Sequence, residues 1–317
     1  MSTARSRLPA CSTSIRASAA ALCLILMILI GSGLAQTSAK PAVILGVLED
    51  FPGNGDGEGA YRSVRIAFKK VGAEWQAYPS DCPDQACLKN GVAQYPAEMT
   101  WTLAFDGKRI GQMSSRNPTD VQLYSSVGQQ EITSPGPVPT VGKRSKDFGT
   151  FLVDEAYRPL VTVSRPYFQD PDVWKPGHMS ADQLTLVRRA FRKKFPKLCQ
   201  LDEKAESGAR PYPYRDQEIK PGKIYSSKTG WSLVELRINA YDCDDERGDT
   251  LDNQWLAIGP RGSAEYLGEG MWLVDAGDYD NDGKSEVLFC IDQYNRGGYK
   301  LFYDDFKKQS VFQFSYH

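Results

Sequence analysis

The chain has 317 residues, with 38 lysines and arginines against 39 aspartates and glutamates, which gives a formal net charge of −1 at pH 7. Charges this closely balanced exclude a strongly basic protein, so we expect no nucleic-acid partner and no attraction to an anionic membrane surface. A chain of this length can bury the core of one large β domain or of two smaller domains.

Residues 1–35 have the pattern of a secretory signal peptide. Arg5, Arg7 and Arg16 precede an apolar run at 17–30, and small residues follow at 33–35. This order is typical of a segment that is removed on export, so the sequence predicts a secreted or periplasmic protein without a membrane span after cleavage. The alternative is an uncleaved N-terminal anchor that tethers the protein to a membrane.

An acidic, glycine-rich stretch follows at 49–59 and is a candidate cation site. Asn54, Asp56 and Glu58 place oxygen ligands at alternate positions. No acid stands four residues beyond Glu58, and the glycines suit an open loop equally well. The sequence alone does not decide whether these three residues bind an ion.

Five of the seven cysteines lie after residue 35, and export permits them to form disulfides. Cys82 and Cys87 frame a short polar loop that a disulfide can close. Cys199 and Cys243 both lie in polar connections and are the natural second pair. Cys290 ends an apolar run and is expected to be a buried thiol outside both disulfides.

Alternation of apolar and polar residues predicts β-strands along most of the chain. The alternating segments lie at 64–68, 99–105, 234–238 and 312–316. Glycine-containing turns separate them, as expected for antiparallel strands. We therefore expect a mainly β fold of propeller-like or stacked antiparallel sheets.

The end of the chain is expected to form a closing hairpin from segments 299–303 and 311–316. The polar residues at 304–309 separate the two segments. Phe312, Phe314 and Tyr316 share one face of the second segment, so we expect all three to lie in the core.

The middle of the chain differs from both ends. Three prolines at 133–140 predict a stiff connection. Ser180 and Gln183 form a capping box ahead of apolar residues at helical spacing, and Pro196 ends this pattern, which predicts one inserted helix over about 180–195. The expected regions are an N-terminal β region at 36–132, a connection with the helix at 133–220, and a C-terminal β region at 221–317.

Residues 278–286 carry the clearest chemical pattern in the chain. Carboxylates stand at positions 1, 3, 5 and 9 of this segment, around Gly283 at position 6. Alternate carboxylates on a tight turn converge on one point, and such oxygen ligands suit Ca²⁺, while glycine lets the backbone bend back. The predicted calcium ligands are Asp278, Asp280, Asp282, Lys284 through its backbone carbonyl, and Glu286.

The residues on either side of this loop are apolar and β-branched or aromatic, so the loop is expected to join two strands. A helix-loop-helix site would need a glutamate at position 12, where this chain has Phe289. The strand-flanked loop resembles the calcium loops of FG-GAP (integrin-α-like) and VCBS repeats over about residues 271–290. This resemblance implies a propeller-like setting, a structural calcium ion, and recognition of an extracellular protein or carbohydrate.

The expected function is binding rather than catalysis. Only His178 and His317 could activate a nucleophile, and neither lies in a pattern that suggests a catalytic site. The acidic run at 242–252 is contiguous, whereas glycoside hydrolysis needs two carboxylates at a set separation. Two alternatives remain, a secreted carbohydrate-active hydrolase or lyase and an architectural component of the cell envelope.

Overall fold

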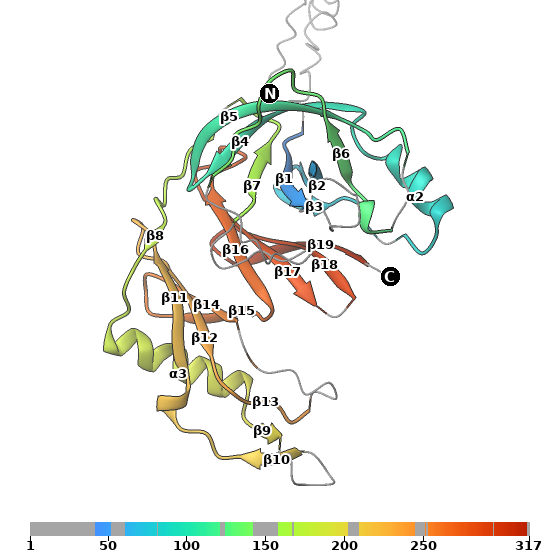
Figure 1. Cartoon of the computed structure of the whole chain (residues 1–317). Helices are drawn as coiled ribbons and strands as arrows, with labels where there is room; N and C mark the ends of the chain where they lie inside the picture. Colours follow the sequence, from blue (N-terminus) through green and yellow to red (C-terminus); the bar gives the residue numbers. More distant parts are fainter. Residues whose placement is uncertain are drawn as a thin grey trace, which may run out of the picture. The chain divides into compact units, whose positions relative to one another are not determined.

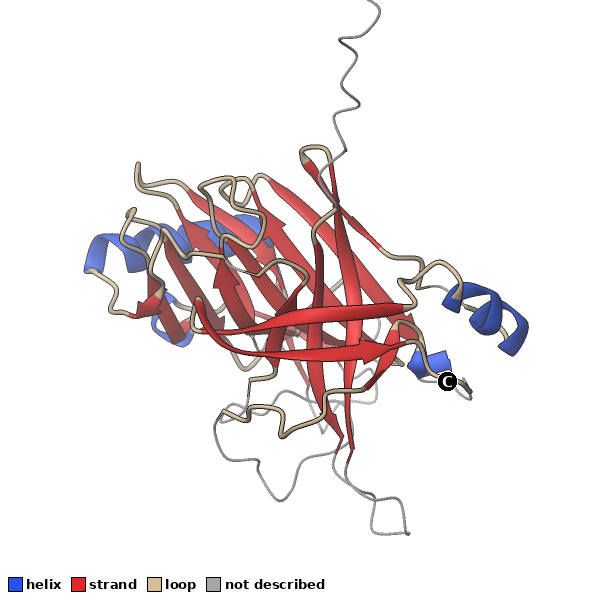
Figure 2. Cartoon of the chain, turned by 90° about the horizontal axis from the view of Figure 1, so that it is seen from above, coloured by secondary structure: helices blue, strands red, loops and turns tan. Residues whose placement is uncertain are grey.

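The computed structural model describes residues 42–51, 61–80, 82–120, 124–141, 158–166, 168–201, 209–244, 251, 253–293 and 295–315. The predicted signal peptide at 1–35 and the candidate ligands Asn54, Asp56 and Glu58 lie outside these residues. Among the described residues, no helix is both long and apolar enough to cross a membrane. Strands are the main secondary structure of the described chain, and the helices lie at their periphery (Figure 2), which confirms the mainly β prediction.

Six antiparallel strands of the N-terminal part close into a barrel-like sheet (Figure 1). Their hydrogen-bonded order is β1-β7-β4-β5-β6-β2, and β1 pairs with β2 to complete the ring, while β3 pairs with one end of β2. Closure was not predicted, because it depends on which strand edges meet and not on the pattern within any strand. The strands are β1 (Ile44–Phe51), β2 (Tyr61–Val71), β3 (Glu74–Ala77), β4 (Glu98–Phe105), β5 (Lys108–Arg116), β6 (Gln129–Ile132) and β7 (Leu160–Val163).

The C-terminal sheet has two buried faces. Along its second strand, Leu288 and Cys290 belong to the core shared with the barrel, while Val287 and Phe289 belong to the core shared with a five-stranded sheet. This alternation places the C-terminal sheet between the other two, because neighbouring side chains of a strand point to opposite faces. Its strands, in hydrogen-bonded order, are β16 (Met271–Gly277), β17 (Glu286–Gln293), β18 (Arg296–Tyr303) and β19 (Lys308–Ser315).

The predicted closing hairpin is present as β18 and β19, which pair along their whole length. Phe312 and Phe314 are buried, with exposed fractions of 0% and 5%. Tyr316, the third aromatic residue expected in the core, lies outside the described residues.

The five-stranded sheet has the order β15-β14-β12-β11-β8. Helix α3 (Ala181–Lys194) covers the face opposite the C-terminal sheet, where its buried side chains Val187 and Phe191 share a separate core with Val234. Ser180 caps this helix through the predicted capping box with Gln183, so the predicted helix is confirmed. The strands are β8 (Lys175–Pro176), β11 (Lys220–Ser226), β12 (Ser232–Arg237), β14 (Gln254–Ile258) and β15 (Ala264–Gly268).

Both predicted disulfides are present. Cys199 lies in β9 (Leu198–Leu201), the central strand of a small sheet with β10 (Ala209–Tyr212) and β13 (Tyr241–Asp242), and it bonds to Cys243 just after β13. The other bridge links Cys87, in the first turn of a second helix, α2 (Gln85–Val92), to Cys82, which lies five positions earlier in the chain. Cys290 is buried and outside both bridges.

Helix α2 was not predicted. Only two of its eight residues, Leu88 and Gly91, are buried, so a helical period is hardly visible in the sequence. Asp84 caps the helix by accepting a hydrogen bond from Cys87 N at 2.8 Å. The disulfide therefore encloses a capped first turn instead of the open polar loop that the spacing suggested.

A buried arginine joins the barrel to the C-terminal sheet. Arg65 is fully buried, its Nε donates to Glu49 Oε1 at 2.7 Å, and its guanidinium lies 4.0 Å from the ring centroid of Phe314. Tyr299 OH also donates to Glu49 Oε1, at 2.6 Å. Because a buried charge is costly unless it is paired, these contacts fix how β18 and β19 pack on β1 and β2.

Candidate metal centre

The loop at 278–285 connects β16 to β17, whose register pairs Gly277 with Glu286, so it joins two strands as predicted. Gly283 has φ +92°, a left-handed conformation that glycine adopts without strain. The start of the loop is held from outside, because Asp278 N donates to Gln169 O at 2.6 Å. Tyr279 is fully buried and packs against Phe168 with ring centroids 5.4 Å apart.

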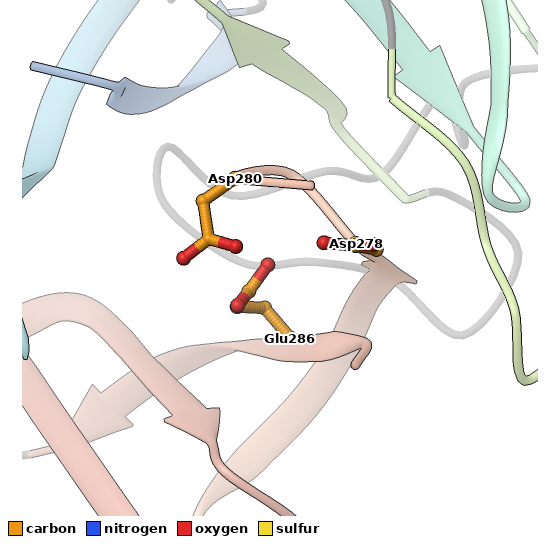
Figure 3. Close-up of side chains that lie close together, drawn as sticks. All are labelled: Asp278, Asp280 and Glu286. Carbon is orange, nitrogen blue, oxygen red and sulfur yellow. The ribbon is translucent and has the colours of Figure 1, made fainter. Parts of the chain in front are cut away.

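Three of the four predicted carboxylates meet at one point. Figure 3 shows Asp278 and Asp280 from the loop and Glu286 from the start of β17, with their oxygen atoms turned to the same small space. One oxygen from each carboxylate lies within 4.8 Å of the others, and the three residues are 5%, 8% and 1% exposed. A cation of the size of Ca²⁺ takes oxygen ligands at about 2.3–2.6 Å, so oxygens at this spacing can share one ion.

The loop's own amides orient these carboxylates. Asp278 accepts hydrogen bonds from Asp282 N at 2.9 Å and from Gly283 N at 2.8 Å, one on each oxygen. Asp280 Oδ1 accepts from Asp282 N at 3.0 Å. These turns form because the alternating aspartates can each reach a main-chain amide two to five residues ahead.

Glu286 is fixed by two donors from different parts of the chain. Tyr279 N donates to its Oε2 at 2.8 Å, and the indole Nε1 of Trp75, in β3, donates to its Oε1 at 3.2 Å. Burial raises the pKa of Glu286 well above its usual range, and the charge of Asp280 adds to this shift. Burial also raises the pKa of Asp278, against the opposing effect of its hydrogen bonds from Gly283 and Asp282.

The other two predicted ligands lie at the outer side of the loop. The Asp282 side chain is 48% exposed, and its Oδ1 accepts from Lys284 N at 2.9 Å. The Lys284 ammonium points away to Asp304 and Asp305, at 2.6 and 2.9 Å, and these bonds raise its pKa. The ammonium of Lys284 is therefore directed away from the carboxylate cluster, and a role for its main-chain carbonyl as an ion ligand stays a prediction.

Sequence reasoning missed three residues whose side chains donate to the candidate ligands from outside the loop, namely Lys70, Arg165 and Trp75. Lys70, in β2, forms ion pairs with Asp280 and, at 4.0 Å, with Asp282. Arg165 donates to the main-chain oxygen of Asp280, and Trp75 contacts Glu286 as described. The sequence around residues 70 and 75 does not indicate that these side chains contact the acidic loop, because the contacts depend on how the barrel and the C-terminal sheet pack together.

Comparisons with protein-family models, with curated proteins and with solved structures find no match to this chain.

Proposed function

We propose that this protein binds one calcium ion at residues 278–286, and that the ion stabilises a secreted β protein that acts in binding and recognition. The observation that carries this proposal is the meeting of three buried carboxylates, Asp278, Asp280 and Glu286, within 4.8 Å. Buried carboxylates that repel one another are unfavourable unless they bind protons or cations. The spacing of the loop, which resembles FG-GAP and VCBS loops, supports calcium as that cation.

The charges around the loop favour a divalent ion. The four carboxylates contribute −4, and the contacting cations Lys70 and Arg165 contribute +2, so the formal charge is −4 + 2 = −2. All the candidate ligands are oxygens, which suit hard cations, and a loop of irregular geometry suits Ca²⁺ better than the strict octahedron of Mg²⁺.

Export is the second part of the proposal. Two disulfides are compatible with an oxidising compartment, and residues 1–35 have the pattern of a signal peptide. The proposed partner is an extracellular protein or a carbohydrate. Sequencing the N-terminus of the protein recovered outside the cytoplasm tests this part, and a secreted chain that begins near residue 36 is the expected result.

Isothermal titration calorimetry and thermal unfolding with calcium test the metal site. At a calcium concentration of about 100 times Kd, binding to the native state alone adds roughly 2.7 kcal/mol of stability. The variant Asp280→Asn keeps an oxygen that can accept from Asp282 N but removes one charge, so it should lose both the heat of binding and the increase in Tm. The matched control is Glu265→Gln, which removes an exposed charge in β15.

Two results would contradict the calcium proposal. One is a wild-type protein that shows neither heat of binding nor a change in Tm with calcium. The other is equal calcium affinity in wild type and Asp280→Asn. Magnesium added in place of calcium should bind much more weakly, and equal affinity for both ions would argue against a calcium loop.

A further inference from the structure

Residues 170–174 form a strained segment that lines part of a cavity of about 500 Å³. Val173 has φ +50°, a left-handed conformation that is a clear outlier for a β-branched residue. Its side chain is 52% exposed, so burial of the side chain does not compensate for this strain. Strain of this kind persists only where the surrounding structure imposes it. The contacts of the segment therefore hold Val173 in a conformation that it would not adopt alone.

The neighbouring residue, Trp174, adds a second unfavourable feature. Its indole Nε1 is buried and has no acceptor in the described part of the chain, although the side chain as a whole is only partly buried. Most buried donors in folded proteins have a partner, and a donor without one costs free energy that it regains on reaching water. Two adjacent residues therefore favour a rearrangement of this segment, Val173 through its backbone and Trp174 through its side chain.

Asp170 holds the segment in place from its first residue. Its Oδ1 accepts from Asp172 N at 3.1 Å and its Oδ2 accepts from Trp174 N at 3.0 Å, so the two bonds lie on either side of Val173. Ser285, at the end of the loop at 278–285, donates from its Oγ to Asp170 Oδ1 at 2.8 Å. Because Ser285 fixes the carboxylate that binds both amides, losing this bond weakens the contacts that keep Val173 left-handed.

A second strained residue meets the same tryptophan. Phe306 has φ +63°, and its ring packs edge-on against that of Trp174 with centroids 6.2 Å apart. The other six non-glycine residues with positive φ among the described residues are Asp or Asn, which tolerate this conformation. The turn that carries Phe306 is tied to the same loop, because Lys284 donates to its two aspartates at 2.6 and 2.9 Å. Two consecutive loop residues, Lys284 and Ser285, therefore hold both strained segments.

We propose that residues 170–174 are a gate of this cavity, and that the bond between Ser285 and Asp170 holds the gate closed. When this bond breaks, Val173 relaxes to a right-handed or extended conformation and the indole N–H of Trp174 turns to water. Opening enlarges the cavity, whose volume already lies in the range of small-ligand sites. Neither Ser285 nor Asp170 is a predicted calcium ligand, so the gate is a device separate from the proposed metal site.

Hydrogen exchange of the Trp174 indole measures the opening, since a buried N–H exchanges with solvent when its segment opens locally. The exchange is followed by NMR on the full protein, ¹⁵N-labelled at its indole groups, in buffer with a chelator. Ser285→Ala removes one hydrogen bond to Asp170 and should speed exchange at Trp174 by up to about tenfold. Trp101, which donates to Ser115 inside the barrel at 2.7 Å, is the internal reference and should keep its rate.

Val173→Asn should act in the opposite direction. Asparagine adopts the left-handed conformation more readily than valine, and the position is exposed, so the closed gate loses strain without losing a buried contact. We expect exchange at Trp174 to slow by about fivefold. The matched control is Val71→Asn, at a position that is 45% exposed and not left-handed, and it should leave the rate at Trp174 unchanged.

The strained gate requires opposite changes of the Trp174 rate in Ser285→Ala and Val173→Asn, with Trp101 constant. An unchanged Trp174 rate in Ser285→Ala would overturn the proposal, and so would equal acceleration at Trp101, which would show a loss of global stability. Unchanged or faster exchange in Val173→Asn would show that strain at this residue does not oppose closure. Calorimetry with calcium on the same protein tests the metal site separately, so either proposal can fail while the other holds.

Discussion

Replacing Lys70 by methionine should increase calcium affinity, because the lysine ammonium competes with the ion for the same carboxylates. Lys70 pairs with Asp280, and its Nζ lies 4.0 Å from Asp282 Oδ2, while the side chain is only 12% exposed. Two unit charges at 4 Å interact by about 4 kcal/mol at an effective dielectric constant of 20 and by about 1 kcal/mol in water. Since Lys70 lies near the surface, we expect a gain between these limits, which is at least about fivefold in Kd.

Calorimetric calcium titrations of wild type, Lys70→Met and Lys69→Met measure this effect. Methionine matches the aliphatic stem of lysine without the ammonium, which in wild type lies 5.4 Å from the ring centroid of Trp75 and 5.5 Å from that of Tyr303, and its thioether can pack beside the same rings. Lys69 is the neighbouring lysine of β2 and lies over Tyr78 instead, so its replacement should leave the affinity unchanged. Equal or weaker calcium binding in Lys70→Met would refute the competition and would suggest that Lys70 itself is the cation that the loop requires.

Two further predictions concern pH and the disulfides. Burial raises the pKa of Asp275 from 3.8 to about 7, so this carboxyl binds its proton more tightly in the folded protein than in the unfolded chain. The free energy of unfolding therefore falls as pH rises from about 4 to about 7, because the carboxyl loses its proton in the unfolded chain first. Asp275→Asn should therefore gain roughly 4 kcal/mol relative to wild type between these pH values, measured by denaturant unfolding, and a constant difference would contradict the burial effect. Replacing both Cys199 and Cys243 by serine should cost about 4 kcal/mol, against about 2 kcal/mol for Cys82 and Cys87, because the first bridge spans 44 positions and the second spans 5. Equal losses of unfolding free energy in the two double variants would show that the entropy of the unfolded chain does not dominate the effect of these disulfides.

Features that depend on neighbours in the sequence were predictable. The capping box of Ser180 and Gln183 marks a helix within its own first turn. The alternation of buried Phe312 and Phe314 with less buried neighbours in β19 follows from the period of a strand. The loop aspartates are oriented by amides two to five residues away, so their convergence is also local. Whether calcium occupies that loop remains a prediction.

Features that depend on distant contacts were not predictable. Trp75 and Glu286 are 211 positions apart in the chain, and their hydrogen bond exists only because β3 packs beside the C-terminal sheet. Closure of the barrel depends on the pairing of β1 with β7 and with β2. A cavity beside Asp275 is lined by residues from five separate segments of the chain. No periodicity in a single sequence encodes which of these segments meet.

Calcium should also change the environment of Trp174, although this residue touches no predicted ligand. Ser285, which precedes Glu286, donates from its Oγ to Asp170 Oδ1 at 2.8 Å, and Asp170 Oδ2 accepts from Trp174 N at 3.0 Å. An ion that orders the loop therefore restrains the segment that carries the indole.

The indole NMR signals report this path with internal controls. Adding calcium should shift the signals of Trp75, which donates to Glu286, and of Trp174, but not that of Trp101, which donates to Ser115 inside the barrel. Ser285→Ala should remove the Trp174 response and keep that of Trp75, because the metal ligands are unchanged while the bond to Asp170 is lost. A Trp174 signal that stays fixed in wild type while the Trp75 signal moves would show that the segment around Trp174 and the loop are mechanically independent.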